Sequence, residues 1–161
     1  MLCARFSVYM PASPAVALLH GSRTSADSST PRILLVEDEA SVARYLSELF
    51  EARGFRVERF SHGTEALQSF AANPSAFDLV LTDQVMPVGS GLELATDMLG
   101  IRPDLPVIVL TGDPDQISDA DIVSSGIKAV LGKPIQSEHL LAKVRSLIGS
   151  MSRSEAGTEQ P

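Results

Sequence analysis

Cysteine and positive charge are both scarce in this sequence. Its single cysteine, Cys3, cannot form an internal disulfide, which favours a reducing compartment. Lysine and arginine number 13 against 20 aspartates and glutamates, so the formal net charge is −7. Proteins that bind nucleic acid need positive charge to displace counterions from phosphates. The acidic balance therefore argues against direct nucleic-acid binding.

Long hydrophobic runs are also missing. No apolar stretch approaches the roughly 18 residues that a membrane-spanning helix requires. A weak apolar patch at residues 15–19 lies in an amino-terminal region that Pro11 and Pro14 interrupt, and this argues against a signal peptide. These absences predict a soluble, cytoplasmic protein without membrane contact.

The sequence has the length of one ordinary domain with a tail at each end. Residues 1–30 show no sustained periodicity and end in a serine-rich run, so we expect a disordered amino-terminal extension. Residues 31–149 form the predicted domain. Residues 150–161 are polar and are expected to be a disordered tail, too short for a separate output domain.

Short apolar runs alternate with segments of helical periodicity across the predicted domain. Most of these runs lack polar alternation, which is typical of strands buried on both faces. The run at residues 55–60 does alternate and predicts a strand nearer an edge. The other runs are residues 33–36, 77–82, 107–110 and 127–131. Five strands that alternate with helices predict an α/β fold with a parallel sheet, whose strands all end at the same edge.

Four residues predict where helices begin and end. Gly54 and Gly126 are expected to end the helices before them, because glycine readily adopts the conformation found at helix C-termini. Ser61 and Ser137 are expected to begin the helices after them, since a serine side chain can cap the first turn.

The most informative stretch is FDLVLTDQVMPVGSG, in which an apolar strand ends at one carboxylate, Asp83, before a loop with proline and two glycines. Other predicted strands end at the acidic pair Glu37 and Asp38, at Thr111 and at Lys133. Ligands of open α/β sheets bind at the carboxyl ends of strands. These five side chains are therefore predicted to converge on one crevice.

The chemistry of such a crevice follows from its charges. Three carboxylates close together repel one another and should either bind protons or recruit a cation. Oxygen ligands with room for water and phosphate suit Mg²⁺. A divalent ion beside a lysine and a hydroxyl equips a site for phosphoryl transfer, with a carboxylate as nucleophile. Asp83 is the best candidate nucleophile because it stands alone on the central strand, whereas Glu37 and Asp38 come as a pair.

Four motifs carry a resemblance to a known family. They are Ile33-Leu-Leu-Val-Glu-Asp-Glu39, Asp78-Leu-Val-Leu-Thr-Asp-Gln-Val-Met-Pro87, Val107-Ile-Val-Leu-Thr-Gly112 and Gly132-Lys-Pro134. In this order and spacing, over residues 31–149, they resemble the receiver domains of two-component response regulators. The resemblance implies a flavodoxin-like, doubly wound sheet of five strands in the order 2-1-3-4-5, with five helices.

The same resemblance implies roles for the crevice residues. Asp83 would accept a phosphoryl group from a histidine kinase or a histidine phosphotransfer protein. Glu37, Asp38, Asp83 and the backbone carbonyl of Val85 would hold Mg²⁺. Thr111 would bond the phosphoryl oxygen and shift inward on activation.

The resemblance also covers Lys133, which would pair with the phosphoryl group and precede a cis peptide bond with Pro134. One position departs from the family, which normally has tyrosine or phenylalanine where this sequence has Val130. Valine has no ring to rotate inward. We therefore expect the phosphorylation chemistry to persist and the usual readout to change.

Val85 lies two residues after Asp83, and Asp113 lies two residues after Thr111. In folds of this kind, these positions flank the expected route of the water that hydrolyses the phosphoryl group. We predict that they set the lifetime of the phosphoryl group. A phosphatase-type enzyme that used Asp83 on small phosphoesters would usually carry a second acid at the position of Val85. This alternative is accordingly disfavoured.

The preferred interpretation is a single-domain response regulator that catalyses only transfer onto its own Asp83 and the subsequent hydrolysis, and so is not an enzyme in the ordinary sense. It would signal through an unknown output protein or a phosphorelay. The Gly-Ser-Gly-Leu-Glu-Leu stretch also resembles receivers attached to hybrid histidine kinases, which would favour a relay or phosphate-sink role. The expected contact face comprises the helix before Gly126, the strand at residues 127–131 and the helix from Ser137, and a weak homodimer would use the same face. A rival is a constitutive scaffold insensitive to phosphate, which Val130 favours and the acidic crevice opposes.

Plainer interpretations exist for each residue. Asp83 alone could cap a loop or helix, the acidic pair could be solvated, and Thr111 and Lys133 could be an ordinary strand end and a surface charge. Their joint occurrence at the strand ends favours a site. The three histidines are scattered and are expected on the exposed surface; they are His20, His62 and His139.

Overall fold

The computed structural model describes residues 30–154, and the positions on either side lie outside the described part of the chain. The predicted amino-terminal extension, except for its last residue, and the end of the predicted tail therefore fall outside it. Within the described part, no helix is both long enough and apolar enough to cross a membrane.

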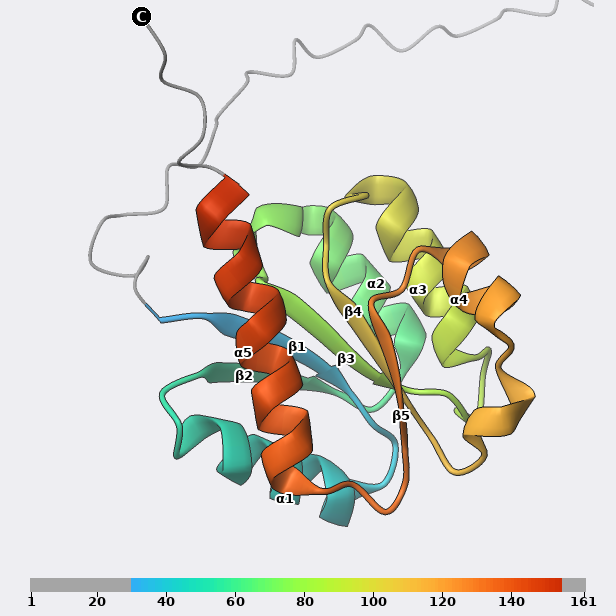
Figure 1. The fold of residues 1–161 in the computed structure, drawn as a ribbon, viewed down its shortest axis with the longest axis horizontal. Helices are drawn as coiled ribbons and strands as arrows, with labels where there is room; N and C mark the ends of the chain where they lie inside the picture. Colours follow the sequence, from blue (N-terminus) through green and yellow to red (C-terminus); the bar gives the residue numbers. More distant parts are fainter. Residues whose placement is uncertain (1–29, 155–161) are drawn as a thin grey trace, which may run out of the picture.

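A five-stranded parallel sheet forms the centre of the fold (Figure 1). Its strands are β1 (Arg32–Val36), β2 (Arg56–Phe60), β3 (Leu79–Asp83), β4 (Val107–Thr111) and β5 (Ala129–Gly132). They lie in the order β2-β1-β3-β4-β5, which confirms the predicted topology and the edge position of the alternating strand. Because β3 lies in the middle, its last residue, Asp83, lies at the centre of the sheet edge.

One α-helix follows each strand, as predicted. The helices are α1 (Ala40–Glu51), α2 (Gly63–Ala72), α3 (Gly91–Ile101), α4 (Asp119–Ser125) and α5 (Ser137–Ser154), with short 3-10 turns η1 (Pro74–Ala76) and η2 (Pro114–Gln116). Helix α5 starts at the predicted Ser137 and extends to Ser154, past the domain boundary that the sequence placed at residue 149.

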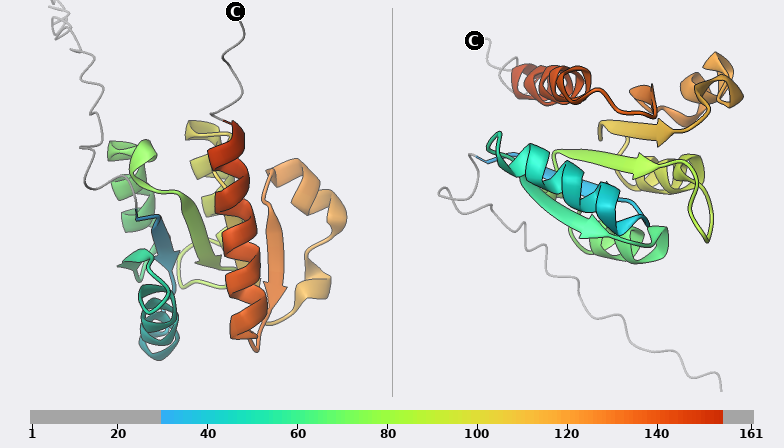
Figure 2. Two further views of the ribbon diagram at one scale, coloured as in Figure 1. Left: turned by 60° about the vertical axis from the view of Figure 1, so that its left-hand side comes forward. Right: turned by 90° about the horizontal axis from the view of Figure 1, so that it is seen from below.

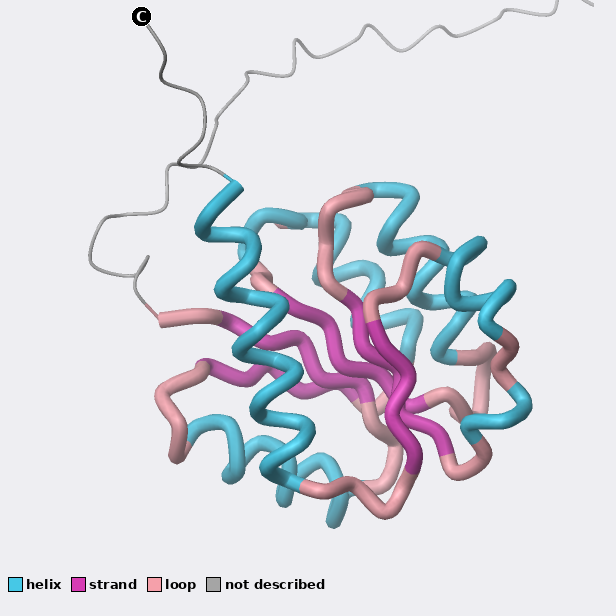
Figure 3. The backbone as a smooth tube through the Cα atoms, in the orientation of Figure 1, coloured by secondary structure: helices cyan, strands magenta, loops and turns pink. Residues whose placement is uncertain are grey.

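Two hydrophobic cores lie on opposite faces of the sheet. In β1, Leu34 and Val36 join the core beneath α2 and α3, whereas Ile33 and Leu35 join the core beneath α1 and α5. Figures 2 and 3 show the sheet between these two helical layers. Burying a leucine or valine contributes about 1.5–3 kcal/mol, so a strand apolar on both faces is stabilised from both sides. This pattern holds the strand ends, and hence the crevice residues, in fixed positions.

The helix ends partly follow the predictions. Gly126 ends α4 in the left-handed conformation, with φ 76°, as expected. Helix α1 ends at Glu51 with Ala52 as its C-cap, and Gly54 adopts the left-handed conformation later in the same turn. The prediction for Ser61 is wrong, because α2 begins one residue later with His62 at its N-cap and no side-chain cap hydrogen bond.

Candidate functional site

The carboxyl edge of the sheet gathers the predicted site residues. Glu37 follows β1 directly, and its amide donates to the Phe60 carbonyl at 3.0 Å, which continues the ladder with β2. Asp83 ends β3 and Thr111 ends β4. The amide of Lys133 donates to the Thr111 carbonyl at 2.7 Å, so the chain beyond β5 is tied to β4. Backbone pairing alone thus fixes the backbone positions from which the side chains of Glu37, Asp83, Thr111 and Lys133 extend.

Three carboxylates meet at this edge, as predicted. Glu37, Asp38 and Asp83 each offer a carboxylate oxygen, and these oxygens lie within 4.8 Å of one another. Glu37 and Asp83 are only 2% and 7% exposed, whereas Asp38 is exposed to solvent. The set combines two buried anions with one that faces water. Hard oxygen donors of this kind, with an open side for water, fit Mg²⁺.

Lys133 lies between the two buried carboxylates. Its Nζ donates to Asp83 Oδ2 at 2.9 Å and to Glu37 Oε2 at 3.1 Å. The Lys133–Pro134 peptide bond is cis, as the resemblance implied. The lysine therefore contacts two of the three carboxylates that form the acidic cluster.

Burial and charge shift the pKa values of this group. Burial raises the pKa of Glu37, and although the hydrogen bond from Lys133 lowers it, the nearby charge of Asp83 raises it further. Burial by itself would lower the pKa of Lys133, but its hydrogen bonds to Asp83 and Glu37 outweigh that effect and raise it. Lys133 is accordingly a firmly charged ammonium group, held where negative charge accumulates.

Thr111 lies at the same edge but bonds to its own loop. Its hydroxyl donates to the Asp113 carbonyl at 3.3 Å and accepts from the Asp113 amide at 3.1 Å. The side chain of Asp113 is itself exposed and accepts a hydrogen bond from Gln116 at 2.8 Å. The Thr111 hydroxyl thus holds the β4–η2 turn together, and its hydrogen bonds within the described residues go to Asp113, not to Asp83.

The loop after Asp83 folds back on the strand. The Val85 amide donates weakly to Asp83 Oδ1 at 3.4 Å, and the Val85 side chain is 72% exposed beside the crevice. The Gly91 amide donates to the Gln84 carbonyl at 3.0 Å, and the Leu92 amide donates to Gln84 Oε1 at 3.1 Å. These bonds fix the start of α3 against the end of β3.

Two features of this loop were missed at the level of sequence. A Cβ atom on Gly91 would collide with the carbonyl oxygen of Asp83, so only glycine fits there without displacement. Ser90 caps α3 in a reciprocal arrangement with Glu93, in which the Glu93 amide donates to Ser90 Oγ at 3.2 Å and Glu93 Oε2 accepts from the Ser90 amide at 2.9 Å. The sequence interpretation had assigned this stretch to a turn only.

Other predicted residues lie away from the crevice or in the core. His62 and His139 are exposed, as expected, and His20 is outside the described residues. Val130 is half-buried and packs against the core beneath α2 and α3.

Comparison with known proteins agrees with this geometry. Residues 33–145 match the family model of the response regulator receiver domain. The response regulator receiver protein CpdR of Brucella abortus is 33% identical over 117 residues, which cover 73% of this chain and 96% of CpdR. Several other curated relatives are longer, and the chain spans 25%, 50% and 55% of their lengths.

Solved structures of response regulator receivers share the fold of this chain. A CheY-like receiver from Methanospirillum hungatei superimposes with a TM-score of 0.72 at 26% identity, over 78% of this chain and 99% of that one. The regulator TrrA of Thermotoga maritima, solved in complex with Mg²⁺ and BeF, gives a TM-score of 0.67 at 30% identity, over 73% of this chain and 99% of TrrA.

Proposed function

Because the chain belongs to the response regulator receiver family, we propose that it accepts a phosphoryl group on Asp83 from a phosphohistidine donor, in the presence of Mg²⁺. The donor would be a histidine kinase or a histidine phosphotransfer protein. The observation that supports this most directly is the contact of Lys133 Nζ with Asp83 Oδ2 at 2.9 Å, inside the cluster of three carboxylates.

The transfer would follow from the positions of these groups. A carboxylate oxygen of Asp83 attacks the phosphorus, the phosphorus–nitrogen bond of the phosphohistidine breaks, and the imidazole leaves with its electron pair and takes up a proton. Glu37, Asp38, Asp83 and the Val85 carbonyl would hold Mg²⁺, which supplies positive charge for the phosphoryl oxygens. Lys133, already within hydrogen-bond distance of Asp83, would transfer one bond to the incoming group.

Thr111 has a second role in this proposal. Its hydroxyl is held in the β4–η2 turn by bonds of 3.1 and 3.3 Å to the backbone of Asp113. Contact with a phosphoryl oxygen on Asp83 requires these bonds to be exchanged. Thr111 would therefore report phosphorylation by releasing the turn that it now closes.

The family is a signalling module, and we infer that it delivers its output through a partner protein. We place output on the face formed by α4, β5 and α5, which would also mediate a weak homodimer, or alternatively in onward phosphotransfer. We propose a single-domain regulator by analogy with CpdR, of which this chain covers 96%. The single cysteine supports the cytoplasmic location that the proposal includes.

The direct test is exposure of the purified chain to acetyl phosphate with Mg²⁺, followed by intact mass spectrometry. We expect a mass gain of one phosphoryl group, which is absent in Asp83→Asn and after chelation of the metal. Autodephosphorylation is then followed as decay of the same mass peak. No gain in the wild-type chain under conditions that modify a known receiver would contradict the proposal.

A constitutive scaffold remains the second candidate, because Val130 packs half-buried against the core and has no ring to reorient. The two functions differ in one measurement. Partner binding that is identical for the wild type and Asp83→Asn, with and without phosphodonor, supports the scaffold.

A further inference from the structure

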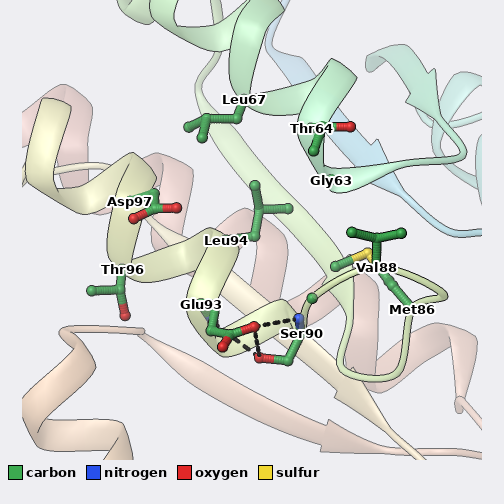
Figure 4. A pocket seen from close by; sticks show the side chains of 11 residues that line it. Gly63, Thr64, Leu67, Met86, Val88, Ser90, Glu93, Leu94, Thr96 and Asp97 are labelled. Atoms are coloured by element: carbon green, nitrogen blue, oxygen red, sulfur yellow. Dashed lines mark hydrogen bonds between the residues drawn. The ribbon is translucent and has the colours of Figure 1, made fainter.

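A groove between α2 and α3 lies outside the phosphoacceptor crevice. Its volume is about 480 Å³, and its apolar surface comes from Leu67 on α2, Leu94 on α3 and Met86 in the loop after β3 (Figure 4). Val88 lies at the rim of the groove and is 68% exposed, so its apolar side chain is in contact with water. The groove thus has an apolar floor in which Met86 and Leu94 are 8% and 5% exposed, and it is a hollow that an apolar side chain of a partner can fill.

The charges around this groove are of one sign. Glu93 and Asp97 lie on its α3 side, one helical turn apart, and both are exposed. No lysine, arginine or histidine lines it among the described residues. An occupant that carries positive charge is therefore favoured over a neutral or acidic one.

An anionic ligand is disfavoured for a second reason. The N-terminus of a helix normally attracts anions through its free amides. In α3 the Glu93 carboxylate already occupies this position, since its Oε2 accepts from the Ser90 amide at 2.9 Å and from the Ser90 hydroxyl at 3.2 Å (Figure 4). A phosphate or carboxylate would meet this fixed negative charge.

The polar groups also favour a protein segment over a small molecule. Small-molecule sites usually direct a few polar groups into an enclosed cavity. Here Thr96 and Asp97 are exposed on the rim, while the interior is formed by leucine and methionine. This arrangement suits a bulky apolar side chain that enters the groove with basic residues beside it.

We propose that the α2–α3 groove is a docking site for a partner segment in which a large apolar side chain is flanked by lysine or arginine. The groove lies on the α2–α3 face of the sheet, opposite the face that α1 and α5 cover. A partner bound there leaves α1 and α5 accessible, so the chain can contact two proteins at once. This inference does not depend on phosphorylation of Asp83.

The test is selection of a random phage-displayed peptide library on the full chain, followed by affinity measurements on the enriched peptides. We expect enriched sequences with an apolar anchor beside basic residues. Val88→Asp and Asp97→Lys should each weaken their binding about tenfold, the scale of a lost interface anchor. The effect of Asp97→Lys should shrink at high salt, because exposed charges are screened.

Two matched controls separate docking from general effects. Val123→Asp makes the same change at a valine that is 81% exposed on α4, and Glu51→Lys makes the same charge reversal on α1. Both controls should bind the selected peptides as the wild type does. Peptides that lack basic residues, that bind Val88→Asp with unchanged affinity, or that cannot be enriched at all would overturn the proposal. An unchanged far-ultraviolet circular dichroism spectrum and urea midpoint of Val88→Asp show that the fold is intact.

Discussion

Gly91 offers the sharpest test of how the structure positions Asp83. A Cβ atom at this position would overlap the Asp83 carbonyl oxygen and lie 3.0 Å from the Asp83 carbonyl carbon and from Gln84 Cα. These are backbone atoms at the end of a buried strand, so no side chain can rotate away. Gly91→Ala must therefore displace the start of α3 from the end of β3.

The size of the effect can be worked out from these contacts. Overpacking of this kind costs about 1–3 kcal/mol. The displacement also strains the Gly91–Gln84 bond of 3.0 Å and the Leu92–Gln84 bond of 3.1 Å, and a hydrogen bond contributes about 0.5–1.5 kcal/mol. The higher helix propensity of alanine returns at most about 1 kcal/mol. The expected net loss is about 2 kcal/mol of unfolding free energy.

The matched control is Gly100→Ala on the same helix. A Cβ at Gly100 meets no atom within 4 Å, so alanine should stabilise the protein by about 0.5–1 kcal/mol. Urea unfolding followed by circular dichroism measures both variants, and the two substitutions should shift the midpoint in opposite directions. If Gly91→Ala is as stable as the wild type, the close approach of α3 to Asp83 is not what the structure indicates. A slower gain of phosphoryl mass in Gly91→Ala alone would link this contact to the site.

Four further outcomes follow from the site. Glu37→Gln should flatten the pH dependence of the unfolding free energy in the absence of metal. The pKa of Glu37 is raised above 4.5 in the folded protein, so its contribution to folded-state stability is complete below pH 4.5 and is lost as the pH rises through the folded pKa. Urea unfolding from pH 4 to 7 checks this, and an unchanged slope of unfolding free energy against pH would refute it. Lys133→Met should abolish phosphorylation of Asp83 and destabilise the metal-free protein by about 3 kcal/mol, because two buried carboxylates lose their cation; mass spectrometry and urea unfolding measure the two effects. Mg²⁺ at a hundredfold excess over its dissociation constant should raise the unfolding free energy by about 2.7 kcal/mol, which is measured as a higher urea midpoint. Asp38→Asn should reduce this gain. Val85→Asn should change the decay rate of the phosphorylated protein, since Val85 is 72% exposed beside the crevice; equal decay rates would contradict a role for Val85.

The fold was predictable because most of its strands are apolar on both faces and the alternating one, β2, lies at an edge. A run such as residues 33–36 is apolar at every position, so it can be buried only between two layers of helices. The residue types of the run therefore predict its place in the fold. Helix starts were less predictable. Ser61 has the right chemistry for a cap, yet β2 ends at Phe60 as predicted and α2 begins at Gly63, with His62 at its N-cap and no side-chain cap hydrogen bond. Ser90 and Glu93 did carry a capping-box signal, which the neighbouring glycines concealed.

The sequence predicted that Glu37, Asp38, Asp83 and Lys133 would lie together. It did not predict which of them are buried or which contact one another. The sequence treats Glu37 and Asp38 as an equivalent pair, whereas the structure buries Glu37 and exposes Asp38. Consecutive residues that leave a strand point in different directions, and only the packed sheet decides which one faces inward. The contact of Lys133 with both buried carboxylates likewise depends on three separate strands, so no local pattern could encode it.

This internal order determines which bonds must change when charge is added at Asp83. The backbone bond from the Lys133 amide to the Thr111 carbonyl, at 2.7 Å, belongs to the ladder of β4 and β5 and resists displacement. The side-chain bonds are weaker: Lys133 divides its contacts between two carboxylates, and the Thr111 hydroxyl makes bonds of 3.1 and 3.3 Å within its own turn. A phosphoryl group on Asp83, as proposed, would compete for both side chains and leave the strands in place. On the proposed mechanism, the turn from Thr111 to η2 would then lose hydrogen bonds before the strands do, and this expectation involves no contact of Val130.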